Sequence, residues 1–329
     1  MTSGANQTPK SVHSTHAMDS MSQLRSRLQL YKQALGAFTS SSSAFKVLST
    51  FPSKHPPRPK TIYVLDSSFN PPTRAHLHLA LSALQKDEHE DVRFPKRLIL
   101  LLAIQNADKA PKPAAFEERL VMMEIFARDL LAKLREDRES PEGAKETSEF
   151  GLESRRKERE ISIDIALTTH PYFVDKAALI SESPSYNSPN PSSPAPPIPQ
   201  VHLVGYDTLV RIMDPKYYPP SHTLSALEPF LSEHRLRVTY RTDDSWAGKK
   251  EQDQYLKDVG EGKMDDMGAQ RDWVNDGRIV LVDGRAEGGE VISSTKVRSA
   301  ARAGDGKMLG PLVTEGVKDW ILEEGLYTD

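Results

Sequence analysis

The chain of 329 residues contains no cysteine. That absence excludes a disulfide scaffold, a zinc site with cysteine ligands, an iron–sulfur cluster and a cysteine nucleophile. A large excess of positive charge is also lacking, because the formal net charge is -3. No global positive field therefore draws the protein to nucleic acid, and we expect no such partner. Any recognition of phosphate has to come from local arrangements of residues.

Long hydrophobic runs are missing as well. No apolar stretch approaches the roughly 20 residues of a membrane-spanning helix, and residues 1–16 lack the apolar segment of a signal peptide. The chain has neither a Gly-x-x-x-x-Gly-Lys loop nor a Gly-x-Gly-x-x-Gly string, which counts against P-loop and dinucleotide-dehydrogenase folds. We therefore expect a soluble protein without a membrane partner, located in the cytoplasm and/or the nucleus.

What is present is an alternation of short β-branched runs and amphipathic helical stretches. The predicted strands are residues 61–65, 97–104, 161–167, 201–204, 237–240 and 278–282. The predicted helices between and after them are residues 72–85, 116–134, 208–213 and 313–324. This alternation predicts an α/β fold, a Rossmann-like doubly wound parallel sheet with helices on both faces. Such sheets bind ligands beyond the carboxyl ends of the strands, where strand order reverses.

The chain divides into an N-terminal extension and one main domain. Residues 1–50 are expected to form a disordered tail and a helix with one apolar stripe, and residues 51–329 the domain. The helix is expected to pack on the domain; the alternative is that it binds a protein partner or a second copy of the chain. Polar composition predicts disordered insertions at 135–160, 181–200 and 243–268, the first of which could instead extend a helix into solvent.

A candidate phosphate site follows the first predicted strand. The string Ser67-Ser68-Phe69-Asn70-Pro71 leads into a helix that begins near Thr73 and His76. These two residues are three positions apart, so they face the same direction beside free backbone N–H groups and the positive end of the helix. A hydroxyl, an imidazole and a helix N-terminus together suit a triphosphate. The alternative is a capping threonine and a surface histidine.

A second candidate lies near the C-terminus, in Ile292-Ser293-Ser294-Thr295-Lys296-Val297-Arg298. Its hydroxyl residues stand just before an apparent helix, as caps do. Arg298 could hold phosphate oxygens with two donors, and Lys296 adds a point charge. The alternative is a capped surface helix with ordinary basic residues.

Together the two strings resemble the signatures of the nicotinamide/nicotinate mononucleotide adenylyltransferase family, within the nucleotidylyltransferase superfamily. That family has Gly-Ser-Phe-Asn-Pro followed by Thr- or His-x-x-His, and later Ile-Ser-Ser-Thr-x-x-Arg. Ser67 stands here in place of the family's glycine, a departure that we expect to affect the rate more than the fold. The resemblance runs from about residue 61 to 327, and it is greatest with the divergent fungal branch called promoter-of-filamentation proteins.

The resemblance implies a role for each matching residue. It implies that Thr73, His76 and Arg298 are catalytic. It implies ATP binding by Ser67, Ser68, Phe69, His76, Gly205, Asp207, Arg241, Ser293, Ser294, Thr295, Lys296 and Arg298. It implies mononucleotide binding by Asn70, Asn106, Lys109, Arg119 and Phe173. Tyr172 and Phe173 stand where the family commonly places a tryptophan against the nicotinamide ring.

The implied reaction is adenylyl transfer from ATP to nicotinamide mononucleotide, giving NAD and pyrophosphate. The acceptor phosphate attacks the α-phosphorus directly, so catalysis comes from alignment and charge stabilisation. Mg²⁺ is expected on the nucleotide, held mainly by phosphates and water, and no protein ligand is assigned to it. One alternative is nicotinate mononucleotide as the acceptor. Another is a divergent ATP-binding or ATP-hydrolysing protein that acts through protein partners, which Ser67 and the insertions motivate.

Overall fold

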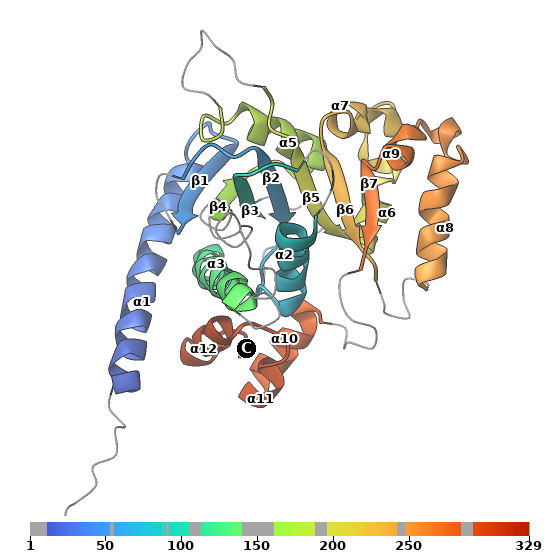
Figure 1. Ribbon diagram of the computed structural model, residues 1–329. Helices are drawn as coiled ribbons and strands as arrows, with labels where there is room; N and C mark the ends of the chain where they lie inside the picture. The colour runs from blue at the N-terminus through green and yellow to red at the C-terminus, as the bar shows by residue number, and fades with distance from the viewer. Residues whose placement is uncertain are drawn as a thin grey trace, which may run out of the picture.

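The computed structural model describes residues 12–52, 56–87, 89, 92–104, 113–139, 161–187, 196–241, 248–283 and 292–328. At its centre is a seven-stranded sheet in the order β1-β4-β3-β2-β5-β6-β7 (Figure 1). The strands are β1 (Phe45–Phe51), β2 (Thr61–Asp66), β3 (Lys96–Ala103), β4 (Ile161–Thr168), β5 (Gln200–Gly205), β6 (Arg235–Thr239) and β7 (Ile279–Val282). Every pairing is parallel except that of β1 with β4. The predicted α/β fold with a doubly wound sheet is confirmed.

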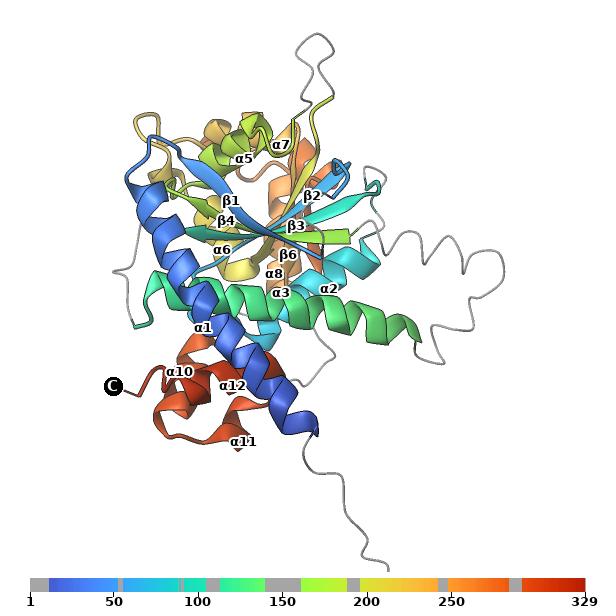
Figure 2. The same ribbon diagram turned by 90° about the vertical axis from the view of Figure 1, so that its left-hand side faces the viewer.

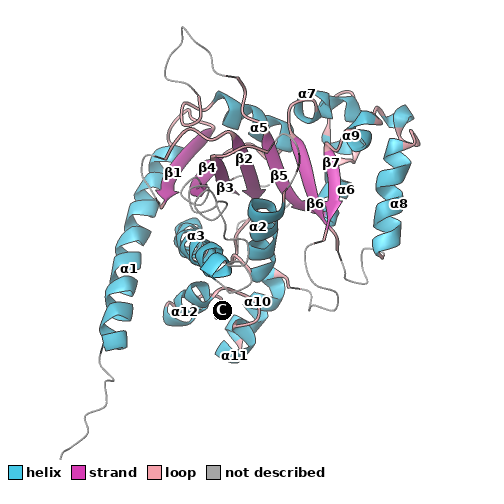
Figure 3. Ribbon diagram, in the orientation of Figure 1, coloured by secondary structure: helices cyan, strands magenta, loops and turns pink. Residues whose placement is uncertain are grey.

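Helices cover both faces of the sheet (Figure 3). They are α1 (Val12–Thr39), α2 (Arg74–Lys86), α3 (Phe116–Glu139), α5 (Phe173–Glu182), α6 (Tyr206–Ile212), α7 (Glu228–Leu231), α8 (Lys249–Gly260), α9 (Asp272–Asn275), α10 (Ser294–Arg302), α11 (Gly306–Leu309) and α12 (Glu315–Glu323). Short 3-10 turns lie at η2 (Pro215–Tyr217), η3 (Leu224–Leu227) and η4 (Asp265–Met267). No helix in the described ranges is both long enough and apolar enough to cross a bilayer.

The central strands are hydrophobic throughout because both of their faces are buried. In β2, Tyr63 and Leu65 join the large core formed with α1, α2, α3 and α10 to α12. Ile62 and Val64 point the other way, into a smaller core with Ile180 of α5. Further along that second face, residues of α5 to α9 form a third cluster against β5, β6 and β7. This two-sided burial holds the carboxyl ends of the strands in fixed positions.

The N-terminal helix α1 lies across α3 (Figure 2). Its Tyr31 is buried in the main core, and Leu28 packs against that core. Glu124 of α3 joins the two helices, because its carboxylate accepts hydrogen bonds from Arg27 (2.9 Å) and from the hydroxyl of Tyr31 (2.7 Å). The helix is therefore packed on the domain through both apolar contacts and a buried polar network.

Two elements form where the sequence indicated another structure. Residues 45–51, expected at the end of an N-terminal helical extension, form the antiparallel edge strand β1, so the extension contributes to the sheet itself. Residues 249–260, expected within a disordered insertion at 243–268, form α8. Only Gln252, Leu256 and Val259 of that helix are buried, and so narrow a stripe is easily overlooked in a polar sequence.

The other two expected insertions are each partly described. Residues 135–139 continue α3, and residues 140–160 lie outside the described residues. In the expected insertion at 181–200, residues 181–182 end α5, Gln200 begins β5, and residues 188–195 lie outside the described residues. The expectation of disorder is wrong at Tyr186, which is buried in the core and donates to Asp164 at 2.8 Å.

Candidate active site

The candidate site lies where the strand order reverses. β2 pairs with β3 on one side and with β5 on the other, and the chain leaves β2 through α2 toward β3. The carboxyl ends of β2 and β5 are therefore the place where an open parallel sheet binds ligands. β2 ends at Asp66, directly before the first motif, and β5 ends at Gly205, two positions before Asp207.

The loop from Ser67 to Thr73 turns sharply into α2. Phe69 adopts a φ of 44°, in the left-handed region that bulky residues rarely occupy. Its side chain is completely buried, and its ring centroid lies 5.3 Å from that of His76. Any contact of Phe69 with a nucleotide would therefore come from its backbone, while its ring supports the imidazole. Ser68 is exposed at the outer side of this turn.

His76 is held from both ring nitrogens. The backbone N–H of Thr73 donates to Nδ1 at 2.9 Å, and the Thr73 hydroxyl lies 2.9 Å from the same nitrogen. Because an N–H group can only donate, Nδ1 is unprotonated and the neutral ring carries its proton on Nε2. Nε2 then donates to the Ser67 hydroxyl oxygen at 2.9 Å. Desolvation by burial lowers the pKa of His76 to about 4, so the ring is a neutral donor at neutral pH.

The start of α10 rests on this same loop. Arg298 donates from Nη1 to the Asn70 carbonyl (2.9 Å), and the Ser294 hydroxyl donates to the Pro71 carbonyl (3.2 Å). Ser293 caps the helix by accepting from the Lys296 backbone N–H at 3.3 Å. The two motifs, over 200 positions apart in the chain, are therefore in direct contact. The Thr295 hydroxyl accepts a hydrogen bond from Nη2 of Arg298 at 3.1 Å. The guanidinium therefore links the start of α10 to the loop before α2.

Two residues predicted to bind the mononucleotide lie in the interior beside this contact. The side-chain oxygen of Asn70 accepts from the Tyr327 hydroxyl at 2.9 Å. Arg119 donates to the Ala114 carbonyl at 2.9 Å, and burial lowers the pKa of its guanidinium. Both side chains are nearly inaccessible to solvent and serve the packing in this structure. Asn106 and Lys109, also predicted here, lie outside the described residues.

On the β5 side, the structure pairs two predicted residues with each other. Arg241 donates from Nε to Asp207 at 2.8 Å. The pair lies over Gly205, where a Cβ would come within 2.7 Å of Asp207 Oδ1 and 3.8 Å of Arg241 Nε. Glycine is therefore needed at this strand end to let the carboxylate lie against the backbone.

The first turn of α5 adds a charged pair that sequence reasoning did not single out. Lys176 forms a buried ion pair with Asp66, and its ammonium lies 5.4 Å from the ring centroid of Phe173. Phe173 packs edge-on against His202, whereas Tyr172 is 37% exposed and is the more accessible of the two rings. The sequence signal for this pair was weak: an acidic residue, Asp66, at the end of a predicted strand, and Lys176 after a later strand.

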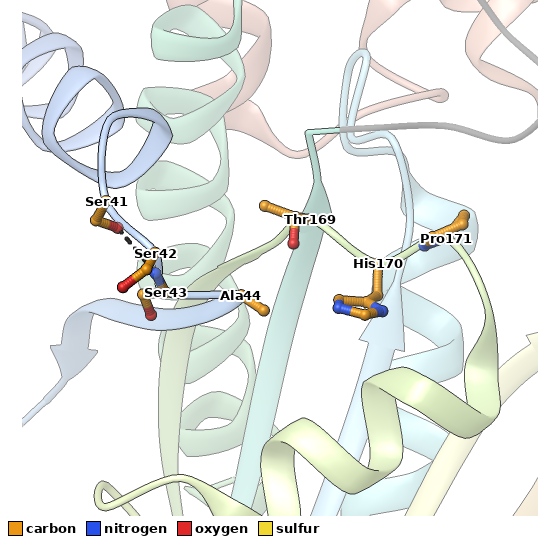
Figure 4. Close-up of a pocket in the computed structure, with 7 residues that line it drawn as sticks. All are labelled: Ser41, Ser42, Ser43, Ala44, Thr169, His170 and Pro171. Carbon is orange, nitrogen blue, oxygen red and sulfur yellow. Dashed lines mark hydrogen bonds between the residues drawn. The ribbon is translucent and has the colours of Figure 1, made fainter.

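An open pocket lies at the carboxyl end of β4, beside α5 (Figure 4). It has a volume of about 460 Å³ and is lined by Ser41, Ser42, Ser43, Ala44, Thr169, His170 and Pro171. Nδ1 of His170 lies 3.5 Å from the Asp175 carboxylate. Sequence reasoning gave these residues no role, because the α1–β1 turn meets β4 only in the folded chain.

The comparisons with known proteins give one relative of clear sequence similarity. A curated Schizosaccharomyces pombe protein, provisionally named a nicotinamide mononucleotide adenylyltransferase, is 33% identical over 248 residues, covering 75% of this chain and 78% of the relative. The chain matches no protein-family model.

Among solved structures, Plasmodium falciparum nicotinic acid mononucleotide adenylyltransferase complexed with NaAD covers 82% of this chain and 98% of its own, at 12% identity and a TM-score of 0.44. The same enzyme complexed with APC has the same coverage, at 11% identity and a TM-score of 0.40.

Proposed function

Because the chain belongs to the nicotinamide/nicotinate mononucleotide adenylyltransferase family, we propose that it transfers the AMP unit of ATP to nicotinamide mononucleotide. The products are NAD and pyrophosphate. The name of the Schizosaccharomyces pombe relative supports the amide acceptor over the acid. We propose nicotinate mononucleotide as the second acceptor, used less well.

One observation carries this proposal: the first turn of α10 lies on the loop that begins α2. Arg298 and Ser294 hydrogen-bond the carbonyls of Asn70 and Pro71, so the N-termini of both helices lie at the switch point of the sheet. Helix N-termini present unpaired N–H groups and positive dipole ends, which together favour a polyphosphate. A capped surface helix elsewhere on the molecule would not bring these features together.

In this proposal, the residues act by alignment and charge stabilisation. His76 donates one hydrogen bond from Nε2 toward the phosphoryl oxygens, in place of its present bond to Ser67. Arg298 and Lys296 offset the negative charge of the triphosphate, and Asp207 accepts from a ribose hydroxyl. Tyr172 and Phe173 supply aromatic surface for the pyridine ring of the acceptor. Mg²⁺ would arrive with the nucleotide substrate and would offset negative charge on its phosphates, and we assign it no protein ligand.

Product analysis tests the proposed function. The protein is incubated with MgATP and either nicotinamide or nicotinate mononucleotide, and the nucleotides are separated by chromatography. We expect NAD and pyrophosphate, formed faster than the acid dinucleotide. Faster formation of the acid dinucleotide would contradict the choice of acceptor but not the reaction. Production of ADP and orthophosphate without any dinucleotide would contradict the reaction and support an ATP-hydrolysing protein.

A further inference from the structure

Helix α8 contacts the residues around the Asp207–Arg241 pair, although neither family motif includes it. Asp253 accepts a hydrogen bond from the hydroxyl of Tyr240, the neighbour of Arg241. Tyr255 packs edge-on against Tyr206, the neighbour of Asp207, with ring centroids 5.9 Å apart. One side of α8 therefore adjoins both halves of the pair. In Figure 1 the helix stands beside β7 and α6, at the edge of the sheet away from β1.

Gln252 contacts Arg241 itself. Its Oε1 accepts from the backbone N–H of Arg241 at 3.1 Å, and its Nε2 donates to the Arg241 carbonyl at 2.6 Å. The side chain is completely buried. A buried amide costs free energy unless it is hydrogen-bonded, and here both of its ends are bonded to one residue. This pair of hydrogen bonds, one accepted and one donated, holds the Arg241 backbone in the way that a neighbouring strand would.

Arg241, the residue fixed in this way, stands two positions after the end of β6, beyond the last sheet pairing of Thr239 with Val282. Its guanidinium reaches across to Asp207 at 2.8 Å, over the backbone of Gly205. Without Gln252, the Arg241 backbone would lose both of these hydrogen bonds and become more mobile. Pairing its guanidinium with Asp207 would then require this backbone to be ordered, which costs conformational entropy. The amide therefore prepares the pair before any ligand arrives.

We propose that Gln252 is a positioning residue for the ATP side of the site, acting through the backbone of Arg241. This inference rests on the proposed function, in which Asp207 accepts a hydrogen bond from the ribose of ATP, and Arg241 holds that carboxylate. In this proposal, α8 increases the affinity of the site for ATP. It does not affect binding of the mononucleotide or the rate of the chemical step.

The test compares Gln252→Ala with Gln254→Ala, a matched control on the exposed side of the same helix, where the Gln254 side chain donates to Asp258. We expect Gln252→Ala to raise both the Kd and the KM for ATP by about tenfold, the loss of roughly one well-formed hydrogen bond. The KM for the mononucleotide and kcat should change less than about twofold, and the control should match the wild type. An equal rise in both KM values, or an unchanged Kd for ATP, would overturn the proposal.

Two further variants keep the test decisive if Gln252→Ala folds poorly. Gln252→Met removes both hydrogen bonds to Arg241 but keeps the volume of the side chain without a buried charge, so its Kd for ATP should rise as far as that of Gln252→Ala. In an Arg241→Ala background, Gln252→Met should add no further loss of ATP affinity, whereas fully additive losses would overturn the proposal. Because the Kd for ATP needs no turnover, a wild type that binds ATP but forms no dinucleotide would defeat the proposed function and leave this test intact.

Discussion

At the scale of single residues, the account depends most on His76. Its ring is supported by Phe69, fixed by Thr73 and bonded to Ser67, which orients one N–H donor at the switch point. We expect His76→Ala to lower kcat by about a hundredfold, as loss of a transition-state donor does, while the circular dichroism spectrum stays unchanged. His78→Ala, two positions along the same helix, is the control and should retain activity. NAD formation at the wild-type rate by His76→Ala would refute the role.

The protonation state of His76 gives a second prediction at this scale. Its lowered pKa means that the folded protein stays neutral at this position while the unfolded chain, with a pKa near 6.5, binds a proton first. Its contribution to stability is therefore complete above pH 6.5 and is lost as the pH falls toward 4. Nitrogen NMR of the ring should show the proton on Nε2 and a titration midpoint near 4. A midpoint near 6.5, or a proton on Nδ1, would contradict the described hydrogen bonds.

At the scale of elements, strongly patterned segments could be predicted from the sequence, and weakly patterned ones could not. β2, β3 and β4 were predicted because burial on both faces requires unbroken apolar runs such as Leu98 to Leu102. β1 was missed because an edge strand with partly buried residues lacks that signal. α8 was missed because most of its surface is polar and solvated, although its Gln252 contacts a predicted site residue.

The docking of α1 gives a prediction at the scale of elements. Burial opposes the charge of Glu124, but hydrogen bonds from Arg128, Tyr31 and Arg27 outweigh it and lower the pKa of this carboxyl group. Glu124→Ala removes the acceptor that Arg27 and the buried hydroxyl of Tyr31 share, so we expect the free energy of unfolding to fall by about 2 kcal/mol. Glu136→Ala, an exposed position on the same helix, should cost less than about 1 kcal/mol. Equal urea midpoints for the two variants would contradict the network.

At the scale of the whole molecule, folding joins two strings that the sequence holds apart. The hydroxyls, the imidazole and the arginine of the site could be predicted, because each string is local and specific. That the two strings meet was implied by the family resemblance, which assigns both of them to ATP. The particular hydrogen bonds could not be predicted, since the Arg298–Asn70 bond spans 228 positions and depends on how α10 returns to the sheet. The same holds for Arg241 and Asp207, whose pairing follows from the neighbouring positions of β5 and β6.

We propose that the site breaks ATP between its α- and β-phosphates. The most direct measurement follows ATP labelled in its α-phosphate, with MgATP and nicotinamide mononucleotide as the only substrates. We expect the label to enter a dinucleotide that comigrates with NAD, with one pyrophosphate released for each dinucleotide formed. Label recovered in ADP, with orthophosphate released in its place, would contradict it.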